Sequence, residues 1–226
     1  RRAQMITSVL AGLSILIIGD SHLTAPEYLV TTLHDGLARQ GAEVHSIGVC
    51  GSTPADWLKA TPGDCGASER KGADKPTFSA NSATTRPITG LLNEEKPDLV
   101  IVVMGDTIAN YSGGSFMKTW AWQNTTQLTK AIAASNTACV WVGPAWGTEG
   151  GKYKKNFTRV KQVSNFLATN VQPCDYINSL DLSKPGQWPT VDGQHFTAPG
   201  YQSWGNALTQ AIASAPVVQN LRKPKP

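Results

Sequence analysis

The chain has 226 residues, of which 40% are hydrophobic and 16% charged, with 21 Gly and 14 Pro. This composition is that of a folded protein, and it excludes a disordered chain, a collagen and a coiled coil. The formal net charge is only +4, from 20 Lys and Arg against 16 Asp and Glu, and the basic residues are dispersed. We therefore predict no nucleic-acid partner, and we expect a monomer with a single domain over residues 1–226.

An apolar stretch, residues 5–18, follows two arginines at the start of the chain. It is similar to the core of a signal peptide but lacks an Ala-x-Ala exit, and it is shorter than the roughly 20 residues of a transmembrane helix. Its second half, residues 14–18, is apolar at nearly every position, as in a strand that helices cover on both faces. We predict a buried strand there and no membrane insertion, and we expect any targeting peptide to precede residue 1.

Short apolar runs alternate with helical patterns along the rest of the chain, which indicates β-α-β units around a parallel sheet. The predicted strands are residues 14–18, 43–50, 98–104, 138–142 and 176–180. The predicted helices are residues 26–40, 85–95, 122–135, 154–169 and 201–213. Residues 61–82 lack periodicity and are predicted to form a long surface excursion, and residues 214–226 a tail that frays at 223–226. The predicted fold class is α/β, with helices on both faces of a central five-stranded parallel sheet.

Ligands of such sheets bind at the carboxyl ends of the strands, and a serine stands at the first of these ends. Ser21 lies in Gly19-Asp20-Ser21-His22, directly after the first predicted strand. A serine at this position can simply cap the following helix, whereas a nucleophilic serine needs a base within hydrogen-bond reach. The question is therefore which histidine could serve as that base.

His195 is the best candidate for the base. It stands just before the last predicted helix, three residues after Asp192, whose carboxylate can fix the tautomer of the imidazole. The other histidines are less suited, because His34 falls mid-helix, His45 falls in a strand, and His22 is too close to the serine in sequence. We predict that Ser21 and His195 meet, with Ser21 exposed on its loop.

These motifs resemble those of the SGNH, or GDSL-type, hydrolases. Gly19-Asp20-Ser21, Gly51 after the second strand and Asp192-x-x-His195 occur in the family's order between Ile15 and about Ala213. The Gly-x-Ser-x-Gly elbow of other esterases is absent. The resemblance implies a flavodoxin-like α/β/α sandwich and a triad in which Ser21 attacks an ester, His195 moves the proton and Asp192 orients His195.

The resemblance also implies an oxyanion hole that includes the backbone N–H groups of Ser21 and Gly51. Family members add an Asn side chain from a Gly-x-Asn-Asp block, but here Thr107 stands at that place. Thr107 or Asn110 could supply the third donor. We favour Asn110 because an amide N–H has a fixed direction, whereas the rotating O–H of a threonine must first be held in place. The alternative is that neither side chain reaches the oxyanion.

Aromatic and basic residues near the carboxyl ends of the strands suggest the substrate. Indoles suit stacking on sugar rings, although core packing is an equal alternative for each. The predicted substrate-binding residues are Trp57, Trp146 and Trp188. The lysines at 152, 154 and 155 flank Tyr153, where they could meet an acidic polysaccharide or form a solvated helix start. No metal-ligand cluster, phosphate loop or dinucleotide fingerprint occurs, so we predict no metal and no cofactor.

The chain has four cysteines, Cys50, Cys65, Cys139 and Cys174, without the spacing of a zinc site. Disulfides are the better interpretation in an oxidising compartment, and buried free thiols are the alternative. The resemblance implies the pairs Cys50–Cys65 and Cys139–Cys174, because family topology makes the last two strands parallel neighbours. We therefore expect a periplasmic or secreted protein.

The leading hypothesis is a serine esterase that removes O-acetyl or similar short acyl groups from a polysaccharide or cell-wall glycan. An O-acetyltransferase would use the same triad to pass the acetyl group to a glycan hydroxyl. A non-catalytic glycan-binding module is a third possibility, disfavoured because Ser21, Asp192 and His195 are all present. A hydrolase of small esters or lipids is also open, although no long apolar lid segment occurs.

Overall fold

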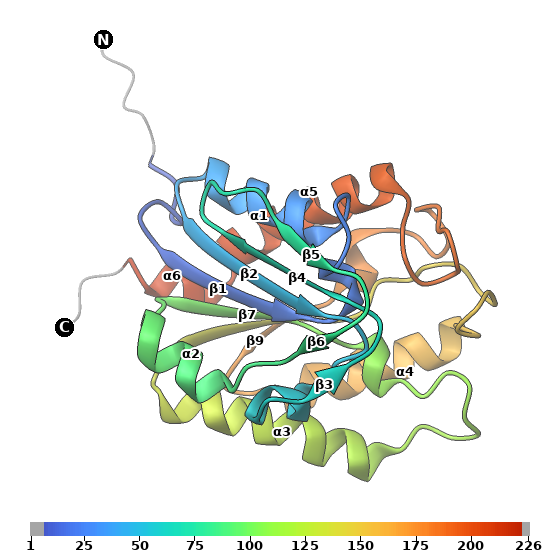
Figure 1. The fold of residues 1–226 in the computed structure, drawn as a ribbon. Helices are drawn as coiled ribbons and strands as arrows, with labels where there is room; N and C mark the ends of the chain where they lie inside the picture. The colour runs from blue at the N-terminus through green and yellow to red at the C-terminus, as the bar shows by residue number, and fades with distance from the viewer. Residues whose placement is uncertain (1–6, 223–226) are drawn as a thin grey trace.

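A computed structural model describes residues 7–222, and within them seven strands form one mixed β-sheet in the order β5-β4-β2-β1-β7-β8-β9 (Figure 1). The five parallel strands are β1 (Ser14–Gly19), β2 (Glu43–Val49), β7 (Leu99–Val103), β8 (Ala138–Val142) and β9 (Asp175–Ile177). They correspond to the five predicted strands, so the α/β class and the parallel centre of the sheet are confirmed.

Helices cover both faces of this sheet, which gives the predicted three layers (Figure 1). One layer contains α1 (Leu29–Arg39), α5 (Ala198–Ser214) and α6 (Pro216–Asn220). The other contains α2 (Ile88–Glu95), α3 (Lys118–Ala134) and α4 (Phe157–Asn170). The helix starts differ from the prediction: α1, α2 and α4 each begin three residues later, α5 begins three residues earlier, and α3 begins four residues earlier.

Strand β1 shows why the central strands are apolar at every position. Ile15 and Ile17 pack in the core cluster under α1 and α5, whereas Leu16 and Ile18 pack in the cluster under α2, α3 and α4. All four side chains are almost completely buried, and burying each contributes about 2 kcal/mol relative to exposure. Because the central strands are parallel, they end together at one edge of the sheet, and that edge carries the site.

The sheet has seven strands rather than the predicted five, because residues 61–82 are not an irregular excursion. They contain β3 (Pro62–Gly63), β4 (Ala67–Lys71) and β5 (Thr77–Ser79), and β4 pairs antiparallel with β2. Strand β3 pairs with β6 (Ala83–Thr84) in a second, two-stranded sheet. Strands β4 and β5 are polar because backbone pairing, of β4 with β2 and of β5 with β4, holds them rather than burial, so no hydrophobic pattern marks them.

The predicted tail, residues 214–226, also contains structure. Helix α6 lies in it, and its Val218 side chain is completely buried against the sheet. The expected fraying at 223–226 and the start of the apolar stretch 5–18 lie outside the described residues. None of the helices within residues 7–222 is both long and apolar enough to span a membrane.

Candidate active site

Ser21 lies immediately beyond the carboxyl end of β1. The strand ends at Gly19, and a single 3-10 turn, Ser21–Leu23, begins after Asp20, whose Oδ1 accepts the backbone N–H of His22 at 3.0 Å. This turn holds Ser21 with only 9% of its surface exposed, so the expected exposed position is wrong. The serine is instead recessed at the base of a cleft.

Ser21, His195 and Asp192 form one hydrogen-bonded chain. The Ser21 Oγ lies 2.6 Å from His195 Nε2, and His195 Nδ1 lies 2.6 Å from Asp192 Oδ2. The other carboxylate oxygen of Asp192 accepts the backbone N–H of His195 at 2.7 Å and that of Gln194 at 2.9 Å. With Asp192 facing Nδ1, the Nδ1–H tautomer leaves the Nε2 lone pair directed at the serine hydroxyl.

The electrostatics of this chain keep the imidazole neutral and the carboxylate charged. Burial lowers the pKa of His195 below its ordinary value, and the nearby His22 ring lowers it further, against the opposing effect of Asp192. Burial alone would raise the pKa of Asp192, but the hydrogen bonds from His195 and Gln194 outweigh it and lower that pKa. His195 is therefore unprotonated, and able to accept a proton, at neutral pH.

A cleft of about 360 Å³ opens beside Ser21, and several hydrogen-bond donors in it are free. Neither the Ser21 nor the Gly51 backbone N–H donates a hydrogen bond within residues 7–222. The Thr107 Oγ1, which is buried, also has no partner in this part of the chain. The sequence-predicted residues Ser21, Gly51 and Thr107 thus line the same cleft with unused donors.

Asn110 lines the cleft too, but its amide is already engaged. The Asn110 Nδ2 donates to the carbonyl oxygen of Ser115 at 3.1 Å, within its own loop. Arg159 holds the same loop by donating to the carbonyls of Ala109 and Asn110 at 2.7 and 2.8 Å. The stated preference for Asn110 as third donor therefore loses its support, because its donor stabilises the loop, whereas the Thr107 hydroxyl is unpaired.

A buried polar network, which the sequence analysis missed, lies against the candidate triad. Asp106 accepts hydrogen bonds from His22 at 2.8 Å, from Tyr111 at 2.6 Å and from Lys155 at 3.1 Å. The Asp106 and Lys155 side chains are each only 1% exposed. Burial alone would raise the pKa of Asp106, but Lys155 and His22 outweigh it and hold that pKa well below its ordinary value.

This network joins loops that come from different strands. His22 follows Ser21 on the loop after β1, Asp106 precedes Thr107 on the loop after β7, and Lys155 ends the loop between β8 and α4. Lys155 is therefore neither a solvated helix start nor a contact for an acidic glycan. No local pattern identifies it in the sequence, whereas Asp106 directly precedes Thr107, which the family resemblance places at the oxyanion hole.

The three tryptophans predicted to bind substrate do not line the cleft. Trp57 is completely buried and donates to Ser52 Oγ at 3.2 Å, and Trp188, 9% exposed, belongs to the core under α5. The Trp146 indole donates to the carbonyl of Leu180 at 2.9 Å and packs edge-on against Phe157. The prediction is wrong for Trp57 and Trp188, whose indoles fill the core, and Trp146, which is partly buried, does not line the cleft.

The structure also locates the cysteines, possible metal ligands and another of the histidines. Cys50 pairs with Cys65 and Cys139 with Cys174, in the expected combination. Within residues 7–222 no group of three His, Cys, Asp or Glu side chains could hold a metal ion. Among the other histidines, His34 contacts Ser46 and Gly72. These contacts tie the helix of His34 to the sheet.

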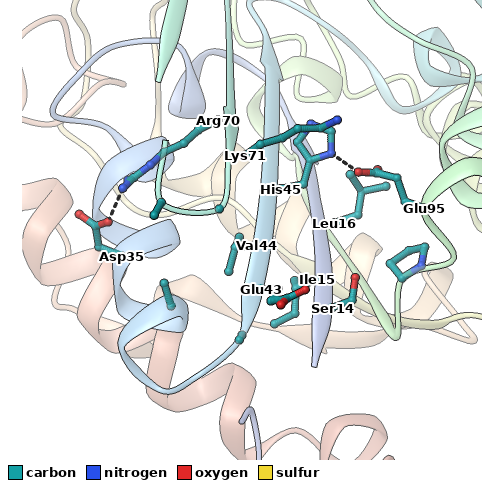
Figure 2. A pocket seen from close by; sticks show the side chains of 15 residues that line it. Ser14, Ile15, Leu16, Asp35, Glu43, Val44, His45, Arg70, Lys71 and Glu95 are labelled. Atoms are coloured by element: carbon teal, nitrogen blue, oxygen red, sulfur yellow. Dashed lines mark hydrogen bonds and ion pairs between the residues drawn. The ribbon is translucent and has the colours of Figure 1, made fainter. Parts of the chain in front are cut away.

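A larger hollow of about 650 Å³ lies at the opposite, amino ends of β1 and β2 (Figure 2). Four of its ionisable side chains are paired: Arg70 binds Asp35 at 2.8 Å, and His45 of β2 contacts Glu95 at the end of α2 (Figure 2). Backbone and aliphatic groups of the strand starts line the rest. The smaller cleft is the candidate active site, because Ser21 and the free donors line it and the His195 imidazole contacts Ser21.

Comparisons with known proteins show a relative of this chain and its fold. No family model matches the chain. Protein BcsX of Komagataeibacter xylinus is 40% identical over 224 residues, which cover 98% of this chain and 84% of that protein. A GDSL-like lipase from Bacteroides thetaiotaomicron superposes with a TM-score of 0.54 at 14% identity, over 92% of this chain and 90% of its own.

Two further solved structures of the same fold are named for acetyl-ester substrates. A peptidoglycan O-acetylesterase has a TM-score of 0.56 at 14% identity, over 90% of this chain and 91% of its own. An acetyl xylan esterase has a TM-score of 0.56 at 13% identity, over 88% of this chain and 100% of its own. The fold is that of the SGNH hydrolases, and by its identity with BcsX along nearly its whole length this chain belongs to the BcsX family.

Proposed function

We propose that this protein is a serine esterase that removes O-acetyl or similar short acyl groups from a glycan through an acyl-enzyme. The observation that carries the proposal is the unbroken chain of hydrogen bonds from Ser21 through His195 to Asp192, each 2.6 Å long. It opens into a cleft that contains unused donors. A non-catalytic binding module would have no need for these three side chains in this arrangement.

The proposed reaction has two halves. His195 Nε2 takes the proton of Ser21 as its oxygen attacks the ester carbonyl, and then returns that proton to the departing alcohol. Water, activated by the same imidazole, hydrolyses the acyl-enzyme in the second half. Asp192 stabilises the imidazolium in both halves, and the lowered pKa of His195 keeps the base unprotonated at neutral pH.

The developing oxyanion needs donors that are in place before the reaction. The free backbone N–H groups of Ser21 and Gly51 and the buried Thr107 hydroxyl are the proposed three. The neighbouring Asp106 carboxylate would repel an oxyanion, but its charge is balanced by Lys155 and its oxygens accept other bonds. A neutral surrounding of this kind favours charge development on the carbonyl oxygen.

The substrate class rests on the cleft and on the comparisons. The volume of about 360 Å³ suits a short acyl group and part of an alcohol, and two structures of the same fold act, by their names, on O-acetylated peptidoglycan and acetylated xylan. The two disulfides fit an oxidising compartment. We therefore propose a periplasmic or secreted carbohydrate O-acetylesterase.

Hydrolysis of p-nitrophenyl acetate by purified protein tests the triad. We expect Ser21→Ala and His195→Ala each to lower kcat by at least about a thousandfold, since both act in the same proton transfer. Ser203→Ala, an exposed serine on α5, is the matched control and should keep full activity. More than a trace of activity in a purified, folded triad variant would exclude this mechanism.

Product analysis with an acetylated glycan then identifies what resolves the acyl-enzyme. Free acetate in the presence of an acceptor sugar is the expected product. Acetyl groups recovered mainly on the acceptor would instead identify a transferase that uses the same triad.

A further inference from the structure

We propose that Gln194 and Tyr153 form a leaving-group subsite that binds the alcohol portion of a sugar ester through its hydroxyl groups. The proposal rests on the esterase function above and goes beyond it, because it names the side chains that recognise the alcohol. Both residues line the cleft beside Ser21, and neither was singled out as a ligand contact by sequence reasoning.

The route of the proton determines which side of the cleft the alcohol occupies. As the Ser21 Oγ–carbonyl bond forms and the ester C–O bond breaks, the proton from Ser21 passes through His195 Nε2 to the departing oxygen. That oxygen must therefore lie within hydrogen-bond reach of Nε2. The carbonyl oxygen lies on the other side, near Gly51 and Thr107. Side chains that line the cleft next to His195 consequently contact the alcohol.

Tyr153 is one of these side chains. Its ring centroid lies 5.6 Å from that of His195, with the planes at 72°, and its hydroxyl makes no hydrogen bond within residues 7–222. Tyr28 also packs on His195, at 5.7 Å, but it does not line the cleft and stacks on Tyr201 at 4.2 Å instead. The aromatic face available to an alcohol is therefore that of Tyr153.

Gln194 is the second side chain that lines the cleft next to His195. It is 8% exposed, and its backbone N–H is held by Asp192 at 2.9 Å, yet its side-chain amide has no hydrogen-bond partner in the described part of the chain. Because Gln194 lines the cleft, this unpaired amide is open to a ligand that enters it. An amide offers a donor and an acceptor together, which matches a sugar hydroxyl and not an aryl group.

The two side chains of the subsite are themselves uncharged, and the Lys152 Nζ lies over the Tyr153 ring at 5.5 Å from its centroid. Asp106 lines the same cleft, but it is paired with the buried Lys155 at 3.1 Å. The unused hydrogen-bonding capacity is therefore neutral, from an amide and a phenol. This capacity fits hydroxyl groups of a sugar next to the scissile ester.

The test compares kcat/KM for a mono-O-acetylated methyl glycoside with kcat/KM for p-nitrophenyl acetate. We expect Gln194→Leu and Tyr153→Phe each to lower the ratio of the two values about tenfold, since each removes a hydrogen-bonding group that the sugar hydroxyls use and the aryl group does not. Trp122→Ala removes an exposed aromatic side chain of α3 outside the cleft and should leave the ratio unchanged. In parallel, the deacetylated glycoside should inhibit aryl ester hydrolysis more weakly in Gln194→Leu than in the wild type.

The outcomes separate the two proposals. An unchanged ratio, or an equal loss on both substrates, in variants that remain folded overturns the subsite and leaves the esterase intact. A wild-type protein that hydrolyses neither ester overturns the esterase, and the subsite with it. If Gln194→Leu does not fold, Gln194→Met keeps the length of the side chain, removes the amide and is held to the same expectation.

Discussion

The buried hydroxyl of Thr107 is unpaired among the described residues and lies beside the candidate nucleophile. We expect Thr107→Val, which keeps the shape and removes the donor, to lower kcat about a hundredfold, or about 3 kcal/mol in barrier. KM should change little, because the donor acts on a charge that exists only in the transition state. Steady-state kinetics with p-nitrophenyl acetate measure both values.

Asn110→Ala is the comparison for this prediction. The Asn110 amide donates to Ser115, so we expect a smaller loss of kcat than in Thr107→Val, arising from a looser loop. The reverse order, with Asn110→Ala the more damaging change, would show that the amide turns into the cleft when substrate binds.

Asp20 carries a stability cost that depends on pH. Burial raises the pKa of its carboxyl from 3.8 to about 6, only partly offset by His22, and its Oδ2 has no partner in the described part of the chain. The pKa of Asp20 is higher in the folded than in the unfolded protein. The stability that the protonated carboxyl contributes is therefore fully present below about pH 3.8 and is lost as pH rises through 6. The shift corresponds to about 3 kcal/mol at pH 7.

We therefore expect Asp20→Asn to be more stable than the wild type at pH 7, by up to this amount, and equal to it near pH 3.5. Asparagine keeps an oxygen that can accept the His22 N–H. Urea unfolding at both pH values measures the difference. Asp64→Asn, at an exposed position, is the control, and an Asp20→Asn gain that does not vary with pH would contradict the explanation.

At the scale of elements, the loop between β8 and α4 determines where Asp192 sits. Gly151 has a φ of 73°, and a Cβ there would lie 2.2 Å from the Asp192 carbonyl oxygen. Gly150 has a φ of 83°, but a Cβ there would meet nothing within 4 Å. Alanine in the left-handed region carries the same backbone cost at both positions, but only at Gly151 would the added Cβ collide with the triad loop.

We expect Gly151→Ala to lower kcat at least about tenfold more than Gly150→Ala, because a displaced Asp192 misaligns His195. Melting temperatures should fall in both variants, since the backbone strain is common to them. Kinetics at a temperature where both are folded decide the question, and equal kcat values would mean that the loop does not position the triad.

The elements that could be predicted from the sequence are those whose signal is local. Buried parallel strands such as β7 are continuous apolar runs, and Ser21 and His195 stand in short motifs at strand and helix ends. Strand β4 could not be found, because edge pairing leaves no hydrophobic pattern. Lys155 and Trp57 were misjudged for a related reason: their burial depends on which loops meet in space, and their neighbours in sequence do not reveal it.

At the scale of the whole molecule, we expect the two disulfides to have different effects, one on activity and the other on stability. Cys50–Cys65 lines the active-site cleft beside Gly51, and Cys65 is exposed. The other pair, Cys139–Cys174, joins β8 to the segment before β9 and is almost completely buried. A mild reductant should therefore reach Cys50–Cys65 first and affect the position of the proposed oxyanion donor Gly51.

We expect Cys50→Ser/Cys65→Ser to lose about tenfold in kcat, because the loop that carries the Gly51 N–H is no longer held. Cys139→Ala/Cys174→Ala should instead keep kcat and lose about 4 kcal/mol of unfolding free energy, the loop-closure value for its separation of 35 residues. Kinetics at 25 °C and urea unfolding of both double variants separate the two effects. A loss of activity in a folded Cys139→Ala/Cys174→Ala variant would contradict this expectation and would show that the buried disulfide affects the cleft through the sheet.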